Sequence, residues 1–145
     1  MRSFRFLTLI VLLAATSCAS HDAAGRRVDE SGRVVHLVLM WLKEPGNVDA
    51  RKKLIQTSYE FGALPGVIRI RAGEPAVIQG LATRPIDDTS FDVAVVMEFK
   101  DQAAYLGYQK SPQHEEAVRD VLRPLTKRVL VYTFANDSTS LTPGK

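Results

Sequence analysis

The sequence predicts one α+β domain of the ferredoxin-like, split βαβ type, and two observations lead to this prediction. The 145 residues, of which 46% are hydrophobic, are enough for a single compact domain with its own core. The apolar residues between positions 33 and 135 also change their spacing in the order strand, helix, strand, strand, helix pair, strand. That order fits a four-stranded antiparallel sheet with helices packed on one face.

Residues 1–17 have the features of a signal peptide for export. Arg2 and Arg5 supply positive charge, and the stretch from Phe6 to Ala15 is apolar apart from one threonine. Ten residues are too few to cross a bilayer as a helix, for which about 20 are needed. We therefore expect the protein to be exported and this segment to be removed.

Cys18 is the only cysteine of the chain, and it follows Ala15 and two small hydroxyl residues. This pattern resembles the lipobox of bacterial lipoproteins, in which the cysteine becomes the acylated first residue of the mature protein. The resemblance implies a lipid anchor on Cys18 in the cell envelope, facing the periplasm or the outside. The class usually has leucine where this chain has Ala15, so cleavage after Ala19 to give a soluble secreted protein is the alternative. Residues 18–32 are polar and charged, and we expect a flexible tether there.

The charge balance argues against a nucleic-acid partner. The formal net charge of +3 includes the two arginines of the signal peptide, and without them 17 basic residues stand against 16 acidic ones. The mature domain also lacks a cysteine pair for a disulfide. An exported domain of this kind must depend on its core or on a partner for stability.

The first strand and helix follow the tether. Residues 34–42 are apolar on both alternating faces, which predicts a strand that is covered on both sides. Residues 44–46 end this strand, and Asn47 is a suitable N-cap for a helix. Gly62 and Pro65 are expected to end that helix.

Two more strands follow, separated by a long connection. In residues 67–73, Ile68 and Ile70 share one face and two arginines occupy the other, which predicts a more exposed strand. Residues 74–90 form the connection, which is either a lid or, by default for such a composition, a solvent-exposed loop. Residues 91–99 then alternate as a third strand.

The last part of the domain is a helix pair and a strand. Asp101 is expected to cap a short helix, and Ser111 to cap the next one with Pro112 at its first position. The fourth strand is predicted at residues 128–134, and residues 136–145 are expected to form a polar tail.

The predicted sheet has more apolar surface than its helices can cover. The first, third and fourth strands carry apolar residues on both faces, whereas a single layer of helices covers only one face. A second copy of the sheet would cover the other face. We therefore expect a homodimer.

Several short motifs occur in a fixed order along the domain: Val35-His36-Leu37-Val38, Leu64-Pro65-Gly66-Val67, Tyr108 followed by Ser111-Pro112-Gln113-His114, Arg123-Pro124-Leu125, and the strand of residues 129–134. In this order they resemble the stress-responsive A/B barrel domain, or Dabb, a family of dimeric α/β barrels. The resemblance covers residues 34–134, and we therefore assign residues 33–135 to a Dabb-like domain. The chain departs from the family at Thr133, where the family often has aspartate, and in the length of the connection 74–90.

The resemblance implies a cavity between the sheet and the helices. Some members, notably plant polyketide cyclases, use a histidine and a tyrosine there for general acid/base chemistry, and His36, Tyr108 and His114 match those positions. The residues alone give one further argument, because His114 shares a helix face with Ala117 and Val121 and should point inward. It also lies in the first helical turn, where the positive helix end disfavours a charged imidazole.

Structural roles are favoured over catalysis for these side chains. An inward histidine at a helix start often only hydrogen-bonds a strand, and His36 could hold a strand end in place. Tyr108 is expected to be a core aromatic residue with a satisfied hydroxyl group. Tyr105 and Trp41 are expected in the core or in the dimer contact.

Metal binding is a weaker hypothesis. His36 and His114 could converge with Glu98, but the sequence has no short spacing typical of metal ligands, and we expect neither a metal nor a cofactor.

Two functions remain open at this stage. The first is a membrane-tethered homodimer that binds a small apolar or aromatic ligand in the barrel cavity. The second is a cofactor-independent enzyme, cyclase or monooxygenase-like, with His114 as base, Tyr108 as acid and His36 as positioning partner.

Overall fold

The computed structural model describes residues 32–80, 82 and 84–136. The predicted signal peptide, Cys18, nearly all of the predicted tether and the polar tail after Asn136 lie outside the described residues. The elements, in chain order, are β1 (Val34–Leu42), α1 (Val48–Glu60), the 3-10 turn η1 (Phe61–Ala63), β2 (Val67–Gly73), β3 (Val93–Phe99), α2 (Gln102–Gln109), α3 (Pro112–Ala117), the π-helical turn η2 (Val118–Leu122), α4 (Arg123–Leu125) and β4 (Thr126–Ala135).

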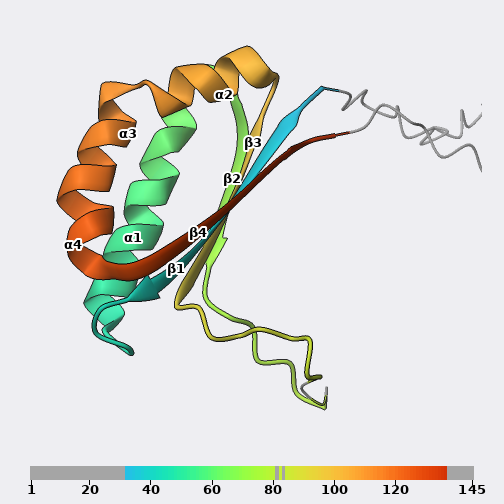
Figure 1. The fold of residues 1–145 in the computed structure, drawn as a ribbon, viewed down its shortest axis with the longest axis vertical. Coiled ribbons are helices and arrows are strands. Elements are labelled where there is room, and N and C mark those ends of the chain that lie inside the picture. The colour runs from blue at the N-terminus through green and yellow to red at the C-terminus, as the bar shows by residue number, and fades with distance from the viewer. Residues whose placement is uncertain (1–31, 81, 83, 137–145) are drawn as a thin grey trace, which may run out of the picture.

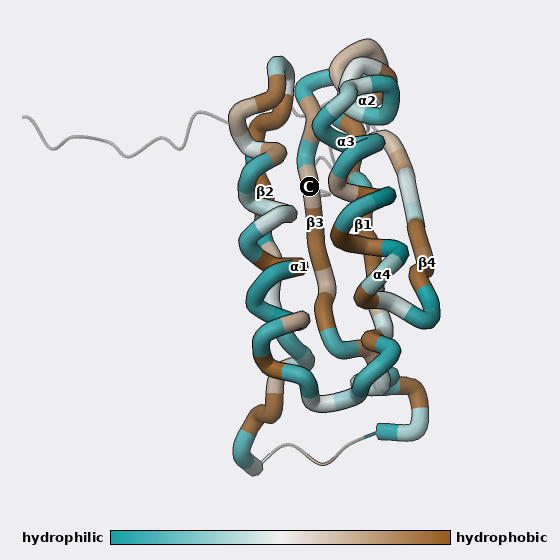
Figure 2. The backbone as a smooth tube through the Cα atoms, turned by 90° about the vertical axis from the view of Figure 1, so that its left-hand side faces the viewer, coloured by the Kyte–Doolittle hydropathy of each residue, from teal (hydrophilic) through white to brown (hydrophobic). Residues whose placement is uncertain are grey.

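The strands form one antiparallel sheet in the order β2-β3-β1-β4. All helices lie on one side of this sheet (Figure 1). The element order and the sheet order confirm the predicted ferredoxin-like α+β fold. Among the described residues the central strands β1 and β3 are largely apolar, whereas α1 is largely hydrophilic toward the viewer in Figure 2.

The three predicted N-caps are present, which explains why the helix starts could be located from sequence. The side chain of Asn47 accepts a hydrogen bond from the Ala50 amide at 2.9 Å, and that of Asp101 accepts one from the Ala104 amide at 2.7 Å. Ser111 caps α3 through the His114 amide at 3.2 Å, with Pro112 as the first residue of the helix. Each cap satisfies a backbone N–H that has no partner inside its own helix.

Strand β2 differs from its predicted pattern at Ile68. The pairing of β2 with β3 shifts between Val67 and Arg69, so that Ile68 has no direct partner and is 42% exposed. Ile70 packs against the core on the helix side, as expected. The prediction that Ile68 and Ile70 share a face was therefore wrong, because an irregularity of this kind moves one residue out of the alternation.

The second helical segment is less regular than predicted. It continues from α3 through the π-helical turn η2 into α4, where Pro124 lies inside the helix. Proline has no N–H and its ring clashes with the carbonyl group one turn earlier, here that of Asp120. The wider turn of η2 gives that carbonyl group more room. Strand β4 begins at Thr126, two residues before the predicted start.

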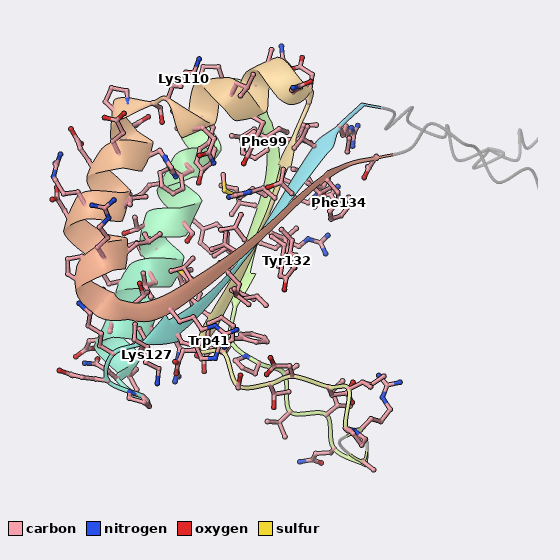
Figure 3. All side chains as sticks on the ribbon, viewed as in Figure 1. Trp41, Phe99, Lys110, Lys127, Tyr132 and Phe134 are labelled. Atoms are coloured by element: carbon pink, nitrogen blue, oxygen red, sulfur yellow. The ribbon has the colours of Figure 1, made fainter. Side chains whose placement is uncertain are left out.

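The core lies between the helices and the central strands. Alternate residues of β1 and β3 point toward the helices, and Phe99 is one of them (Figure 3). The largest fully buried side chains are Phe99, Met40, Leu42, Leu54, Met97 and Val93. Burial of each such side chain stabilises the fold by about 1.5–3 kcal/mol.

The opposite side of the sheet, which we call the open sheet face, has no helix over it. Tyr132 and Phe134 point away from the helices there (Figure 3) and are 53% and 55% exposed. By the register of the strands, the apolar residues of this face are Val35, Leu37, Leu39, Ala94, Val96, Leu130, Tyr132 and Phe134. The single layer of helices thus leaves an apolar surface, as the sequence predicted.

The connection from β2 to β3 extends away from the domain on the side of the open sheet face (Figure 1). Its base is held by two hydrogen bonds: Trp41 Nε1 donates to Ser90 Oγ at 3.0 Å, and the Leu42 amide donates to Asp92 at 2.8 Å. Val77 and Ile86 in this connection are 94% and 80% exposed. No helix in the described part of the chain is long and apolar enough to cross a membrane.

Candidate functional site

A cavity of about 400 Å³ lies between the sheet and the second helical segment. Strands β1 and β4 form its floor, and α2, α3, η2 and α4 form its wall. Figure 2 shows α3 and α4 in front of β1, and β4 at the edge of the sheet. The lining residues are His36, Val38, Tyr105, Tyr108, Gln109, His114, Val118, Leu122, Arg123, Thr126, Val129 and Val131.

His36 lies on the cavity floor in β1, with Met97 and Thr133 as its neighbours across the sheet. It is only 4% exposed, and its Nδ1 lies 2.9 Å from Thr133 Oγ1. Burial, and secondarily the nearby His114, lowers the pKa of His36 to about 4. The imidazole is therefore neutral at physiological pH.

Tyr108 lies in the last turn of α2 and is 5% exposed. Its ring lies between those of Phe99 and Phe61, with centroid separations of 5.2 Å and 5.3 Å. Burial, with a smaller contribution from Tyr105, raises the pKa of its phenol. Within the described part of the chain the Tyr108 hydroxyl group has no hydrogen-bond partner. Tyr108 is thus a core aromatic residue as predicted, but no described residue hydrogen-bonds its hydroxyl group, and that oxygen is not among the fully buried atoms without a partner.

His114 lies in the first turn of α3 and is half-buried. Its ring centroid is 4.6 Å from that of Tyr108. Burial lowers the pKa of His114, although a hydrogen bond to the Gln109 backbone and the nearby Glu115 act in the opposite direction. The sequence argument expected the helix end to keep this imidazole neutral, whereas burial is the largest cause that the structure supplies.

The three residues selected from the sequence therefore lie around one cavity. Tyr108 is in the middle, with its ring 5.8 Å from that of His36 and 4.6 Å from that of His114. The set combines two neutral imidazoles with one protonated phenol. Such a set can hydrogen-bond a ligand, and it can also accept and donate a proton at neighbouring positions.

Two polar residues that the sequence analysis named, Tyr105 and Thr133, belong to the site although it did not place them there. Tyr105 was expected in the core or in a dimer contact, but its ring lies 5.3 Å from that of His36 and its hydroxyl group lies 3.4 Å from Thr133 Oγ1. Thr133 hydrogen-bonds His36 directly. Tyr105 precedes Tyr108 by one helical turn and so shares its face, which is a signal that could have identified it.

Gln109 and Arg123 also line the cavity, and the sequence analysis assigned neither of them to the site, although Arg123 belongs to one of the motifs that carry the family resemblance. Gln109 is the last residue of α2. Arg123 reaches the cavity from α4, directly after the π-helical turn. Its position depends on how that turn is wound, which the sequence analysis did not anticipate.

The set of His36, His114 and Glu98 does not converge. Glu98 pairs with Val35 across the sheet and so points to the open sheet face, away from the cavity, where it forms an ion pair with Arg69 at 3.6 Å. Among the residues that the structure describes, no group of three or more histidine, cysteine, aspartate or glutamate side chains could hold a metal ion. The connection 74–90 contributes no described residue to the cavity lining, so the structure gives no support to its proposed role as a lid.

The chain matches one family model and is similar in fold to several solved structures. The model of the stress responsive A/B barrel domain, or Dabb, matches residues 34–136. No curated protein matches the chain. A Dabb family protein with a ferredoxin-like fold from Mesorhizobium loti is 25% identical, with a TM-score of 0.59 over 73% of this chain and 98% of its own.

Two further structures share the fold at lower identity. A dimeric ferredoxin-like protein from Thermobifida fusca is 20% identical, with a TM-score of 0.57 over 76% of this chain and 96% of its own. The cofactor-independent oxygenase SnoaB from Streptomyces nogalater is 15% identical, with a TM-score of 0.54 over 79% of this chain and all of its own.

The buried neutral His36 predicts that the fold loses stability in mild acid. The unfolded chain takes up a proton on this histidine below its ordinary pKa of 6.5, whereas the folded chain does so only near pH 4. The contribution of His36 to the free energy of unfolding is therefore fully present above about pH 6.5. About 3 kcal/mol of that free energy is lost as the pH falls from 6.5 to 4. Urea unfolding at pH 7.0 and 4.5 measures this loss.

The variant His36→Gln isolates the effect, because it keeps a polar side chain beside Thr133 but does not titrate. We expect its stability to fall by about 2–3 kcal/mol less over the same pH interval. An equal loss of stability in both proteins would show that His36 is not the group responsible.

Proposed function

The chain belongs to the stress-responsive A/B barrel domain family, and from this premise we propose that it is an exported, lipid-anchored homodimer that binds a small apolar or aromatic ligand. The ligand would occupy the cavity lined by His36, Tyr108 and His114. Its body would lie against aromatic and aliphatic side chains, and the neutral polar groups would orient it.

The observation that carries this proposal is the cavity itself, which brings the ring of Tyr108 to 5.8 Å from that of His36 and to 4.6 Å from that of His114. The cavity volume of about 400 Å³ also lies within the usual range for ligand pockets. A ligand of this size would fill the space and could hydrogen-bond the Tyr108 hydroxyl group, for which the described residues offer no partner.

Self-association is supported by the open sheet face. Leu37 and Leu39 lie at its centre, and Tyr132 and Phe134 extend it along β4. The connection 74–90 adds exposed apolar residues on the same side. The related protein from Thermobifida fusca is dimeric. A second copy of the sheet would bury this surface.

Membrane attachment rests on the sequence around Cys18. An acylated Cys18 followed by the tether of residues 18–32 would keep the domain close to the membrane, because a flexible chain of that length reaches about 20 Å. The domain would face the periplasm or the outside of the cell. Secretion as a soluble protein after cleavage at Ala19 is the alternative.

A cofactor-independent enzyme, cyclase or monooxygenase-like, is the second candidate function. It is favoured by one observation, the neutral His114 imidazole with its ring 4.6 Å from that of Tyr108. In this role His114 would be the base, Tyr108 the acid and His36 a positioning partner. SnoaB, which shares the fold, is a cofactor-independent oxygenase.

Native mass spectrometry on protein purified gently from its own membranes tests the main proposal in one spectrum. We expect the mass of a dimer, an added lipid on each chain and a retained small molecule. The variant Cys18→Ser should lose the lipid mass and move to the soluble fraction, while the dimer and the ligand remain. An unmodified wild-type chain that begins at Ser20 would contradict lipid anchoring and favour secretion.

The variant Leu37→Arg tests the homodimer through the open sheet face. An arginine that is buried there without a partner would cost about 3 kcal/mol or more, so we expect the dimer dissociation constant to rise at least about a hundredfold. Sedimentation equilibrium measures it. Leu106→Arg, on the exposed side of α2, is the matched control and should leave the dimer intact. A wild-type monomer at micromolar concentration would contradict the homodimer.

The variant His114→Ala separates the two functions once the retained molecule is known. If the protein is an enzyme, turnover of that molecule should fall by about a hundredfold to ten-thousandfold while binding changes little. Gln113→Ala, the exposed neighbour in the same helical turn, should change neither. If His114→Ala leaves any measured turnover intact, the enzyme hypothesis is to be abandoned in favour of binding alone.

A further inference from the structure

The charge of the cavity lining is uneven. Arg123 is the one lining residue with a full charge at neutral pH, and no acidic residue is among the lining side chains. The imidazoles of His36 and His114 are neutral, because burial lowers the pKa of both. A ligand in this cavity therefore meets one positive group and otherwise neutral surface.

Arg123 has no anionic partner in the part of the chain that the structure describes. Among residues 32–80, 82 and 84–136, no ion pair or hydrogen bond involves its side chain. Asp120 is the acidic residue one helical turn earlier, and both of its carboxylate oxygens are held by Arg119, at 2.7 Å and 2.8 Å. The guanidinium group of Arg123 is thus available to a ligand.

The two ends of the cavity also differ in their exposure to solvent. His36 and Tyr108 are almost completely buried, whereas Arg123 and Val131 are exposed. Arg123 therefore lies at the rim, and His36 and Tyr108 lie at the bottom. A charge placed at the rim keeps part of its hydration, whereas a charge placed at the bottom would lose it without a compensating partner.

We propose that the cavity takes ligands that combine an apolar body with one carboxylate, and that Arg123 binds the carboxylate at the rim. This inference rests on the proposed ligand-binding function and narrows its ligand class. The guanidinium group presents two parallel N–H donors that match the two oxygens of a carboxylate. The apolar body, aromatic or aliphatic, then extends inward toward Tyr105 and Tyr108.

Isothermal titration at pH 7 with two matched pairs of probes tests this proposal. The aromatic pair is 2-naphthoate and 2-naphthamide, and the aliphatic pair is octanoate and octanamide. In each pair the body is the same and only the charge differs. Comparison of the aromatic pair with the aliphatic pair shows whether the natural ligand is an aromatic acid or a fatty acid.

We expect at least one acid to bind wild-type protein about tenfold more tightly than its amide. Arg123→Gln should remove this preference by weakening the acid alone. Lys127→Gln removes an equal charge close by, outside the cavity lining, and should leave the preference unchanged. Val118→Phe, which fills the cavity, should abolish binding of acid and amide together.

Two results would overturn the proposal. Only one of them also counts against the proposed ligand cavity. Equal affinities for acid and amide, or an equal loss of both in Arg123→Gln, would remove the role of Arg123 but leave the ligand cavity in place. Absence of binding by all four probes would count against the ligand cavity itself and against the carboxylate with it. Circular dichroism of each variant shows whether it is folded.

Discussion

The sheet has two apolar faces and only one layer of helices, and the rest of the molecule depends on this imbalance. Strands β1 and β3 alternate apolar residues on both sides, so that Phe99 and Met97 meet the helices while Leu37 and Val96 face away from them. Burial of the helix side supplies the core. The other side is left for a second layer, which the described residues do not provide.

The same helices also cover their own side of the sheet unequally, and this produces the cavity. Helix α1 and the turn η1 bury Leu54 and Phe61 against the central strands. On the side of β4, Val129 and Val131 face the second helical segment and remain 38% and 52% exposed. The cavity is therefore the part of the sheet-helix space that helices only partly cover, and its polar residues project into it from both walls.

Burial also sets the protonation states in the cavity. His36 hydrogen-bonds Thr133, a neutral group, in a position where the family often has aspartate. A carboxylate beside the imidazole would favour its charged form and raise its pKa, whereas a hydroxyl group leaves desolvation unopposed. The departure at Thr133 therefore converts a possible imidazolium-carboxylate pair into a neutral hydrogen bond, and it leaves Arg123 as the charged group of the lining.

Local signals in the sequence were enough to predict the strands and the helix caps, but they were not enough to predict every residue of the site. The strands at 34–42 and 67–73 and the caps at Asn47, Asp101 and Ser111 depend on alternation or on one turn of backbone, so the sequence predicted them correctly. The irregularity at Ile68 depends on pairing with β3, and the places of Thr133 and Arg123 depend on strand register and on the π-helical turn.

Such features arise from contacts between distant segments, which no local pattern encodes. The resemblance to the family selected His36, Tyr108 and His114, and only His114 had a local signal of its own, its place on an apolar helix face. Filling the cavity with aliphatic residues would give a drier and more stable core. Two imidazoles and a phenol at that position are therefore not explained by the stability of the fold, and this is the physical reason for proposing a ligand there.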